Sequence, residues 1–430
     1  MLQVLLKLQK GRFQFTWLNR DGKLISIRSR GGVSLSSRTS LFEILKVSFQ
    51  LGLTSFGGPV AHLGYFHEEY VKRRKWIDER SYADLVALCQ FLPGPASSQV
   101  GMGIGYMRGG VIGAILAWLG FTLPSAVGLA LFAYLCQGLD VGSTGWIHGL
   151  KLAAVAIVAQ AVWGMGKNLI PDRSRATIAI LTCMTMLLFN SALIQIALIA
   201  AAGILGSWLY KNAAGSSGNA HVLLAAPPSK HKELAICCLL AFFGLLILLP
   251  LLRSIYPSQW VAIFDSFYRS GSLVFGGGHV MLPLLEKEVV PSGWMSQEQF
   301  LAGYGATQAI PGPLSTFASY LGFVIHGWGG AAVATVAIFL PAFLLVMGAI
   351  PFWEMLRKQP QVRGALLGIN ASVVGILLAA LYDPVWVSAV RTPGDFGLAL
   401  ALFGALIYWK LAPWIVVVAA AAGGMLLTLI

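Results

Sequence analysis

Long apolar segments alternate with short polar loops along most of this chain. Apolar runs of about 18 or more residues are long enough to span a bilayer, and they predict an all-α, polytopic membrane protein. A β-barrel is excluded because barrel strands alternate apolar and polar residues, whereas these runs are continuous. Continuous segments are expected near residues 111–136, 146–166, 176–189, 192–210, 234–252, 330–350, 364–381, 396–409 and 412–430.

Two further apolar segments of the first half are interrupted at their centres. Residues 41–70 contain Phe56-Gly57-Gly58-Pro59, and residues 81–108 contain Pro93-Gly94-Pro95. Proline removes a backbone donor and stops a helix, while glycine lets the chain turn. The pattern predicts broken or re-entrant helices. Hairpins that return to the same side would leave nine spans, and full crossings with broken centres would give about thirteen.

The whole pattern occurs twice. Pro311-Gly312-Pro313 follows Pro93-Gly94-Pro95 by 218 residues, and Phe275-Gly276-Gly277 follows Phe56-Gly57-Gly58 by 219. The chain is therefore duplicated, and residues 234–252 have no counterpart in the first half. We expect a basic cytoplasmic tail, a first repeat, a Gly/Ser/Pro-rich linker, an extra transmembrane helix and a second repeat, at residues 1–40, 41–211, 212–232, 233–252 and 253–430, respectively.

Loop charge indicates how the two repeats are oriented. The loop after the first broken segment carries the run Lys72-Arg73-Arg74-Lys75, whereas its counterpart, residues 289–299, has no lysine or arginine. Cytoplasmic loops are enriched in these residues, and the contrast reverses at the next pair of loops. The halves are thus predicted to be inverted-topology repeats, with the extra helix supplying the odd crossing. We expect a cytoplasmic N-terminus and an external C-terminus.

Composition supports the membrane assignment and narrows the partners. The 430 residues are 57% hydrophobic and 11% charged, with a mean hydropathy of +0.74. A net charge of +13 would suggest nucleic acid in a soluble chain, but here the basic residues lie in loops and determine topology. The five cysteines show no CxxC or CxxH spacing, so no metal site is expected. An Arg/Ser-rich stretch at residues 27–40 leaves an organellar transit peptide as the alternative to a flexible tail.

The broken segments are the candidate binding site. A helix that restarts after a proline offers free N–H groups and the positive end of its dipole to an anion. Nearby hydroxyl and amide groups would add donors, so we expect a small tetrahedral oxyanion. The alternative is that the breaks only kink helices for packing. The candidate binding residues are Gly57, Gly58, Gln90, Gly94, Ser97, Ser98, Gln99, Gly276, Gly277, Gln308, Gly312, Ser315 and Thr316.

A few ionisable residues lie within the apolar stretches, where charge is costly and usually functional. Five of them are candidates for attracting the anion or carrying a coupled proton: Lys46, Glu69, Arg108, Asp265 and Glu288. The alternative is that they lie at helix ends and extend to the membrane interface. Asp265 and Arg269 are four residues apart and are also expected to pair on one helix.

These motifs resemble the chromate ion transporter family. The resemblance rests on Phe56-Gly57-Gly58-Pro59, Trp76, the stretch LCQFLPGPASSQ at residues 88–99, and a second copy containing TQAIPGPLST at residues 307–316. It covers residues 41–430 and implies a long, two-domain member that exports chromate at the expense of the proton gradient. Gly278 stands where the first copy has Pro59, so the two halves need not contribute equally.

The resemblance implies a secondary transporter of chromate in the plasma or inner membrane, contributing to chromate resistance. Sulfate has the same charge and shape, so the alternatives are a transporter of sulfate or another oxyanion, or an anion channel on the same fold. No nucleophile–base set, metal spacing or cofactor loop is present, so we do not expect an enzyme or a cofactor. Protons and lipid are the other expected partners, and a homodimer is one alternative for the assembly.

Overall fold

A computed structural model describes residues 5–9, 12–18, 24–28, 41–56, 58–137, 145–189, 191–210, 230–275, 278–353 and 359–428. The chain forms two compact units, Met1–Ser40 and Leu41–Ile430.

The first unit contains a small antiparallel sheet in the order β1-β2-β3, made of β1 (Leu5–Gln9), β2 (Arg12–Leu18) and β3 (Leu24–Arg28). Phe15 of β2 pairs with Leu6 on one side and Ile27 on the other. Residues 1–40 were expected to form a flexible, basic cytoplasmic tail in an all-α protein, so these strands differ from the expectation. The signal for the strands is the alternation of aromatic and polar residues in β2, which is too short to stand out beside the long apolar segments.

The second unit is helical throughout the part that the structure describes. Its first repeat contains α1 (Leu41–Thr54), α2 (Gly58–Phe66), the π-helix η1 (His67–Arg73), α3 (Glu79–Phe91), α4 (Ala96–Leu135), α5 (Gly145–Leu169), α6 (Arg173–Leu188) and α7 (Ala192–Leu209). The unmatched helix α8 (Lys230–Ile255) follows. The second repeat contains α9 (Gln259–Ser272), η2 (Gly278–Val280), α10 (Met281–Val289), α11 (Gln297–Thr307), η3 (Leu314–Thr316), α12 (Phe317–Ala349), η4 (Ile350–Phe352), α14 (Pro360–Ala380), η5 (Leu381–Trp386), α15 (Val387–Ala389), α16 (Pro393–Ile407) and α17 (Pro413–Leu427).

The broken segments of the first repeat are hairpins. Arg74, just after η1, forms an ion pair of 2.7 Å with Glu43 in the first turn of α1, so the two ends of this segment meet. The segment formed by α3 and the start of α4 also doubles back. This follows from Gly103, where an added Cβ would lie 2.8 Å from the Leu85 side chain. These two residues are equally distant in sequence from Gly94. The geometry therefore favours the hairpin alternative over full crossings.

Helix α4 itself contains a sharp turn, at the boundary between the segments expected at residues 81–108 and 111–136. Its residues Gly109 and Gly110 are non-helical, and Gly110 has φ +62°. A Cβ at Gly105 would lie 2.4 Å from the carbonyl oxygen of Gly113, so the arms before and after the turn lie side by side. The second repeat has the same construction in α12, whose turn is at His326 and Gly327.

The two turns lie at opposite ends of the helical unit. In α4 the second arm runs from residue 111 to residue 135, which is about 37 Å at 1.5 Å per residue. Phe323, three residues before the turn of α12, packs against Tyr134 at the far end of this arm, with ring centroids 6.2 Å apart. The repeats are therefore antiparallel, as the loop charges predicted.

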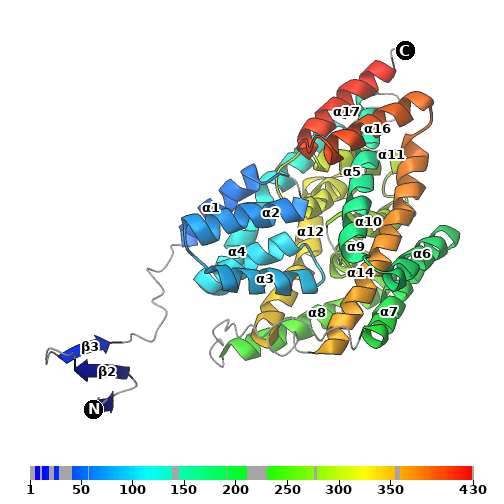
Figure 1. Ribbon diagram of the computed structural model, residues 1–430. Helices are drawn as coiled ribbons and strands as arrows, with labels where there is room; N and C mark the ends of the chain where they lie inside the picture. The colour runs from blue at the N-terminus through cyan, green and yellow to red at the C-terminus, as the bar shows by residue number, and fades with distance from the viewer. Residues whose placement is uncertain are drawn as a thin grey trace. The chain divides into compact units, whose positions relative to one another are not determined.

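The last helices of each repeat pack on the other repeat (Figure 1). Helices α6 and α7 lie along α14, whereas α16 and α17 lie along α5. Glycines allow the close approach: a Cβ at Gly206 would lie 2.4 Å from the Gly364 oxygen, and one at Gly424 would lie 2.3 Å from the Gly145 oxygen. The two repeats thus share one interlocked core.

Among the described residues, five helices are long and apolar enough to cross a membrane: Ala96–Leu135, Gly145–Leu169, Lys232–Ile255, Leu314–Phe352 and Pro360–Ala389. Three shorter apolar helices, Leu193–Leu209, Pro393–Ile407 and Pro413–Leu427, accompany them. The nine continuous segments expected from sequence all correspond to helices or to the second arms of α4 and α12, which supports a multi-pass membrane protein.

Candidate oxyanion site where the hairpins meet

The Pro-Gly-Pro loop of each repeat contacts the glycine break of the other repeat. Gly94 N donates a hydrogen bond of 2.7 Å to the carbonyl oxygen of Val274, which directly precedes Phe275 and the second break. Gly312 N donates one of 2.9 Å to the carbonyl oxygen of Ser55, which directly precedes Phe56 and the first break. Each Pro-Gly-Pro loop is therefore bound to the residue that precedes the glycine break of the other repeat.

Both loops need glycine for two independent reasons. Gly94 has φ +122° and Gly312 has φ +111°, a region that side chains rarely adopt. A Cβ at Gly94 would lie 2.9 Å from the Cβ of Ala342, and one at Gly312 would lie 2.6 Å from Ser125 Oγ. Ala342 and Ser125 directly follow Pro341 and Pro124, so these two equivalent helix prolines mark where each loop docks.

The loops are surrounded by buried polar atoms that have no hydrogen-bond partner among the described residues. Burial of an unpaired hydroxyl or amide costs about 1–3 kcal/mol, so such a cluster points to a ligand. Six of these atoms belong to the loops or to the residues that pack on them: Ser55 Oγ, Ser98 Oγ, Gln99 Oε1, Thr122 Oγ1, Gln308 Nε2 and Ser315 Oγ. All six side chains are at most 8% exposed.

Four of the predicted binding residues, Ser98, Gln99, Gln308 and Ser315, belong to this cluster, whereas Thr316 at the second loop donates its hydroxyl to the Pro313 oxygen at 2.6 Å. Gln90 lies on an exposed face of α3, because that helix continues to Phe91 and the loop starts only afterwards. Gly57, Gly276 and Gly277 lie outside the described residues. Gly58 has φ +80° and no atom within 4 Å of the place of its Cβ, as suits a turn with open space beside it.

Sequence reasoning missed the contribution of the prolines' own helices. Thr122 and Ser125 carry no motif, and only the equivalence of Pro124 and Pro341 marks their neighbourhood, while Ser55 directly precedes the first glycine break but was not singled out. His62 was assigned no role, yet its Nδ1 lies 3.3 Å from Ser97 Oγ in the buried interior. His279 is likewise paired, with Nδ1 2.8 Å from the hydroxyl of Tyr304.

A cavity of about 710 Å³ opens between α1 and η1. Thr54 lines it next to Ser55, while Glu69, Arg73 and Arg74 line it from η1. Both Glu69 oxygens are paired, one with Arg74 Nε at 2.6 Å and the other with Arg73 at 3.2 Å. The cavity is thus lined by two arginines and a glutamate of η1 and reaches Thr54 at the end of α1.

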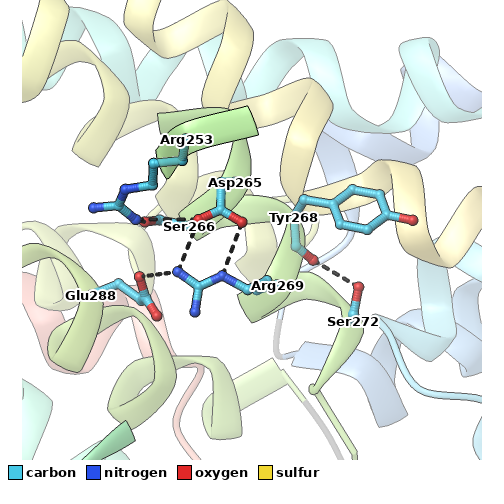
Figure 2. A network of polar contacts seen from close by, with 7 residues as sticks. All are labelled: Arg253, Asp265, Ser266, Tyr268, Arg269, Ser272 and Glu288. Carbon is cyan, nitrogen blue, oxygen red and sulfur yellow. Dashed lines mark hydrogen bonds and ion pairs between the residues drawn. The ribbon is translucent and has the colours of Figure 1, made fainter. Parts of the chain in front are cut away.

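The equivalent place in the second repeat is occupied by an ion-pair network (Figure 2). Asp265 is 1% exposed and accepts from Arg253 of α8 at 3.2 Å and from Arg269 at 3.0 and 3.1 Å. Arg269 also binds Glu288 at 3.0 Å. Of the other charge candidates, Lys46 is exposed on α1, and the Arg108 guanidinium lies 5.6 Å from the centroid of the Trp76 ring.

The comparisons with known proteins agree with this architecture. The chromate transporter family model matches residues 42–207 and 261–425, once in each repeat. A chromate transport protein of Pseudomonas aeruginosa is 29% identical over 391 residues, covering 87% of this chain and 89% of that protein. One of Cupriavidus metallidurans is 28% identical over 403 residues, covering 91% and 94%. No solved structure matches the chain. With two matched repeats in an interlocked helical membrane unit, this chain belongs to the chromate transporter family.

Proposed function

We propose that this protein is a secondary active transporter that exports chromate from the cytoplasm, driven by the proton gradient. One observation carries the proposal: buried hydroxyl and amide groups without partners among the described residues surround the two Pro-Gly-Pro loops. The relatives named as chromate transport proteins supply the substrate. We assign residues 41–211 and 253–430 to the two repeats, 212–232 to the linker and 233–252 to the extra helix.

The site suits an oxyanion that is bound by neutral donors. Chromate offers four oxygens in tetrahedral geometry, each able to accept hydrogen bonds from hydroxyl, amide and backbone N–H groups. Helix α4 begins at Ala96, directly after Pro95, so its first-turn N–H groups face the loop with the positive end of the dipole. Sulfate has the same shape and charge and is the expected competitor.

We further propose that Glu69 carries the coupled proton. It lines the open cavity and holds Arg73 and Arg74, so protonation would release Arg73 to attract the anion and leave Arg74 paired with Glu43. Asp265 is less suited, because its side chain is 1% exposed, whereas Glu69 lines the open cavity and is accessible to a proton from solvent. The protein would lie in the cell membrane with a cytoplasmic N-terminus and an external C-terminus, alone or as a homodimer.

The test is chromate uptake into inverted membrane vesicles, with and without an imposed proton gradient. We expect accumulation that a protonophore abolishes and that excess sulfate inhibits. Uptake that ignores the gradient would indicate a channel instead. Accumulation of sulfate but not of chromate would be consistent with the oxyanion site and would contradict chromate as the substrate.

Two neighbouring carboxylates separate the coupling role from general charge effects. Glu69→Gln should remove the stimulation by the gradient, since the amide cannot take up a proton. Glu68→Gln is the matched control, because Glu68 is 56% exposed and pairs across one helical turn with Lys72. Equal gradient stimulation in the two variants would contradict a coupling role for Glu69.

A further inference from the structure

The two Pro-Gly-Pro loops are equivalent in sequence but not in surroundings. Each loop packs on residues of the opposite repeat, and these can be compared pair by pair. Gly312 contacts Ser55 and Ser125, whereas Gly94 contacts Val274 and Ala342 at the corresponding positions. At these positions the first repeat places two serines beside the second loop, whereas the second repeat places two apolar residues beside the first loop.

The second loop has hydrogen-bond donors from both repeats. Thr122 lies one helical turn before Ser125, which touches Gly312, and Ser55 binds Gly312 through its carbonyl oxygen. The hydroxyls of Ser55 and Thr122 are buried and have no partner in the described part of the chain. The same holds for Ser315 Oγ and Gln308 Nε2 of the loop's own repeat. These four donors belong to the second loop or to residues at or within one helical turn of its contacts, and together they suit an acceptor-rich ligand.

The first loop lacks this set. The counterpart of Thr122 is Phe339, 217 residues later, which has no hydrogen-bonding group. Ser97, the counterpart of Ser315, already contacts His62 at 3.3 Å. Gln99 donates its amide nitrogen to the Pro93 oxygen at 2.9 Å, which turns its own oxygen, an acceptor, toward the interior. That oxygen would repel an anion and oppose the Ser98 hydroxyl and the first-turn N–H groups of α4, which would favour it.

We propose that the protein has a single, asymmetric binding site for a tetrahedral oxyanion at Gly312, with donors from both repeats: Ser55, Thr122, Gln308 and Ser315. The inference rests on the proposed transport of such an anion and specifies where it binds. The first loop is a scaffold that holds the crossing hairpins. Because two donors come from each repeat, relative movement of the repeats would disassemble the site and release the anion.

The experiment compares equivalent positions in full-length protein reconstituted into liposomes. Ser315→Ala and Thr122→Val should each raise the KM for chromate at least tenfold and reduce the rise in melting temperature that chromate produces in the purified protein. Ser315→Thr keeps the hydroxyl and should restore most of the affinity. Ser97→Ala, the equivalent change in the first loop, should alter the KM by less than threefold.

Thr335→Val and Ser272→Ala are matched controls for loss of a buried hydroxyl. Thr335 and Ser272 donate to carbonyl oxygens of their own helices, Ala331 at 2.7 Å and Tyr268 at 2.8 Å. Both variants should bind chromate normally, and melting temperatures without ligand would show whether any variant is merely misfolded.

The outcomes are distinct. Equal losses in Ser97→Ala and Ser315→Ala would overturn the asymmetry and indicate two equal sites. Normal binding in both Ser315→Ala and Thr122→Val would overturn the site altogether. A third outcome is a wild-type protein that neither binds nor transports chromate, while its melting temperature rises with sulfate and Ser315→Ala abolishes that rise. This outcome would contradict the proposed substrate and support the site.

Discussion

At the scale of single residues, Arg269 shows how a charge is retained inside this apolar unit. Its guanidinium binds Asp265 with two nitrogens and Glu288 with one of them, so both carboxylates have a partner in a region where an isolated charge is very costly. Arg253 adds a third contact to Asp265 from α8. The network therefore also attaches the unmatched helix to the second repeat.

This arrangement predicts unequal effects of removing the two arginines. Arg269→Gln leaves Asp265, which is 1% exposed, with one weaker partner, and should cost about 3 kcal/mol of stability. Arg253→Gln leaves both Arg269 contacts in place and should cost about 1 kcal/mol. Thermal unfolding of purified protein in detergent would measure both.

The double variant Asp265→Asn/Arg269→Gln provides the control, because it removes the buried charge together with its partner. It should be more stable than Arg269→Gln alone. A double variant that only adds the two losses would mean that the pair is not coupled.

At the scale of elements, glycine decides where helices turn and touch. Gly105 meets Gly113 across the turn of α4, where only small residues let the two backbones approach so closely. The same contact joins Gly322 and Gly330 in α12, where the Cβ of either residue would lie within 2.2 Å of the other's oxygen. Each hairpin thus depends on two small residues and one turn.

A side chain at Gly105 should open the α4 hairpin. Gly105→Val would place Cβ 2.4 Å from a backbone oxygen, which cannot move away as a flexible side chain could, so we expect a loss of more than about 3 kcal/mol or failure to fold. Gly164→Val in α5 is the control, since no atom lies within 4 Å of its Cβ position. Yield of monodisperse protein and its melting temperature are the measurements, and similar values for both variants would contradict the tight contact.

At the scale of the whole molecule, neither repeat is complete alone. Helices α6 and α7 bury their small-residue faces on α14, and α16 and α17 bury theirs on α5. The loops cross in the same way, with Gly94 bound to the second repeat and Gly312 to the first. Exchange of contacts at both levels makes the repeats a single folding unit.

Splitting the chain in the linker tests this interdependence. Residues 1–211 and 230–430 expressed as separate polypeptides should copurify and regain chromate transport, whereas either piece alone should be degraded or aggregate, since it exposes the faces normally covered by the other. Pull-down through a tag on one piece is the measurement. Stable, monodisperse single pieces would show that each repeat folds by itself.

Much of this organisation could be predicted from local sequence patterns. Continuous apolar runs specify helices through the cost of unpaired backbone in lipid, and Pro-Gly-Pro specifies breaks through backbone chemistry that acts within a few residues. The duplication by itself indicated that the residues of both loops share a common site, among them Gly94, Ser97, Ser98, Gln99, Gln308, Gly312, Ser315 and Thr316. Loop charge likewise indicated the opposite orientation of the repeats.

Only the tertiary structure decided which parts meet. Pairing of Gly312 with Ser55 and Ser125 joins residues far apart in the chain, and such contacts depend on the summed packing of many helices rather than on any local pattern. For the same reason Thr122, which we propose as a donor, was not among the residues expected at the site, and Gln90 was expected there although α3 holds it on an exposed face. Sequence repetition made the two loops look equal, whereas their neighbours in space make them different.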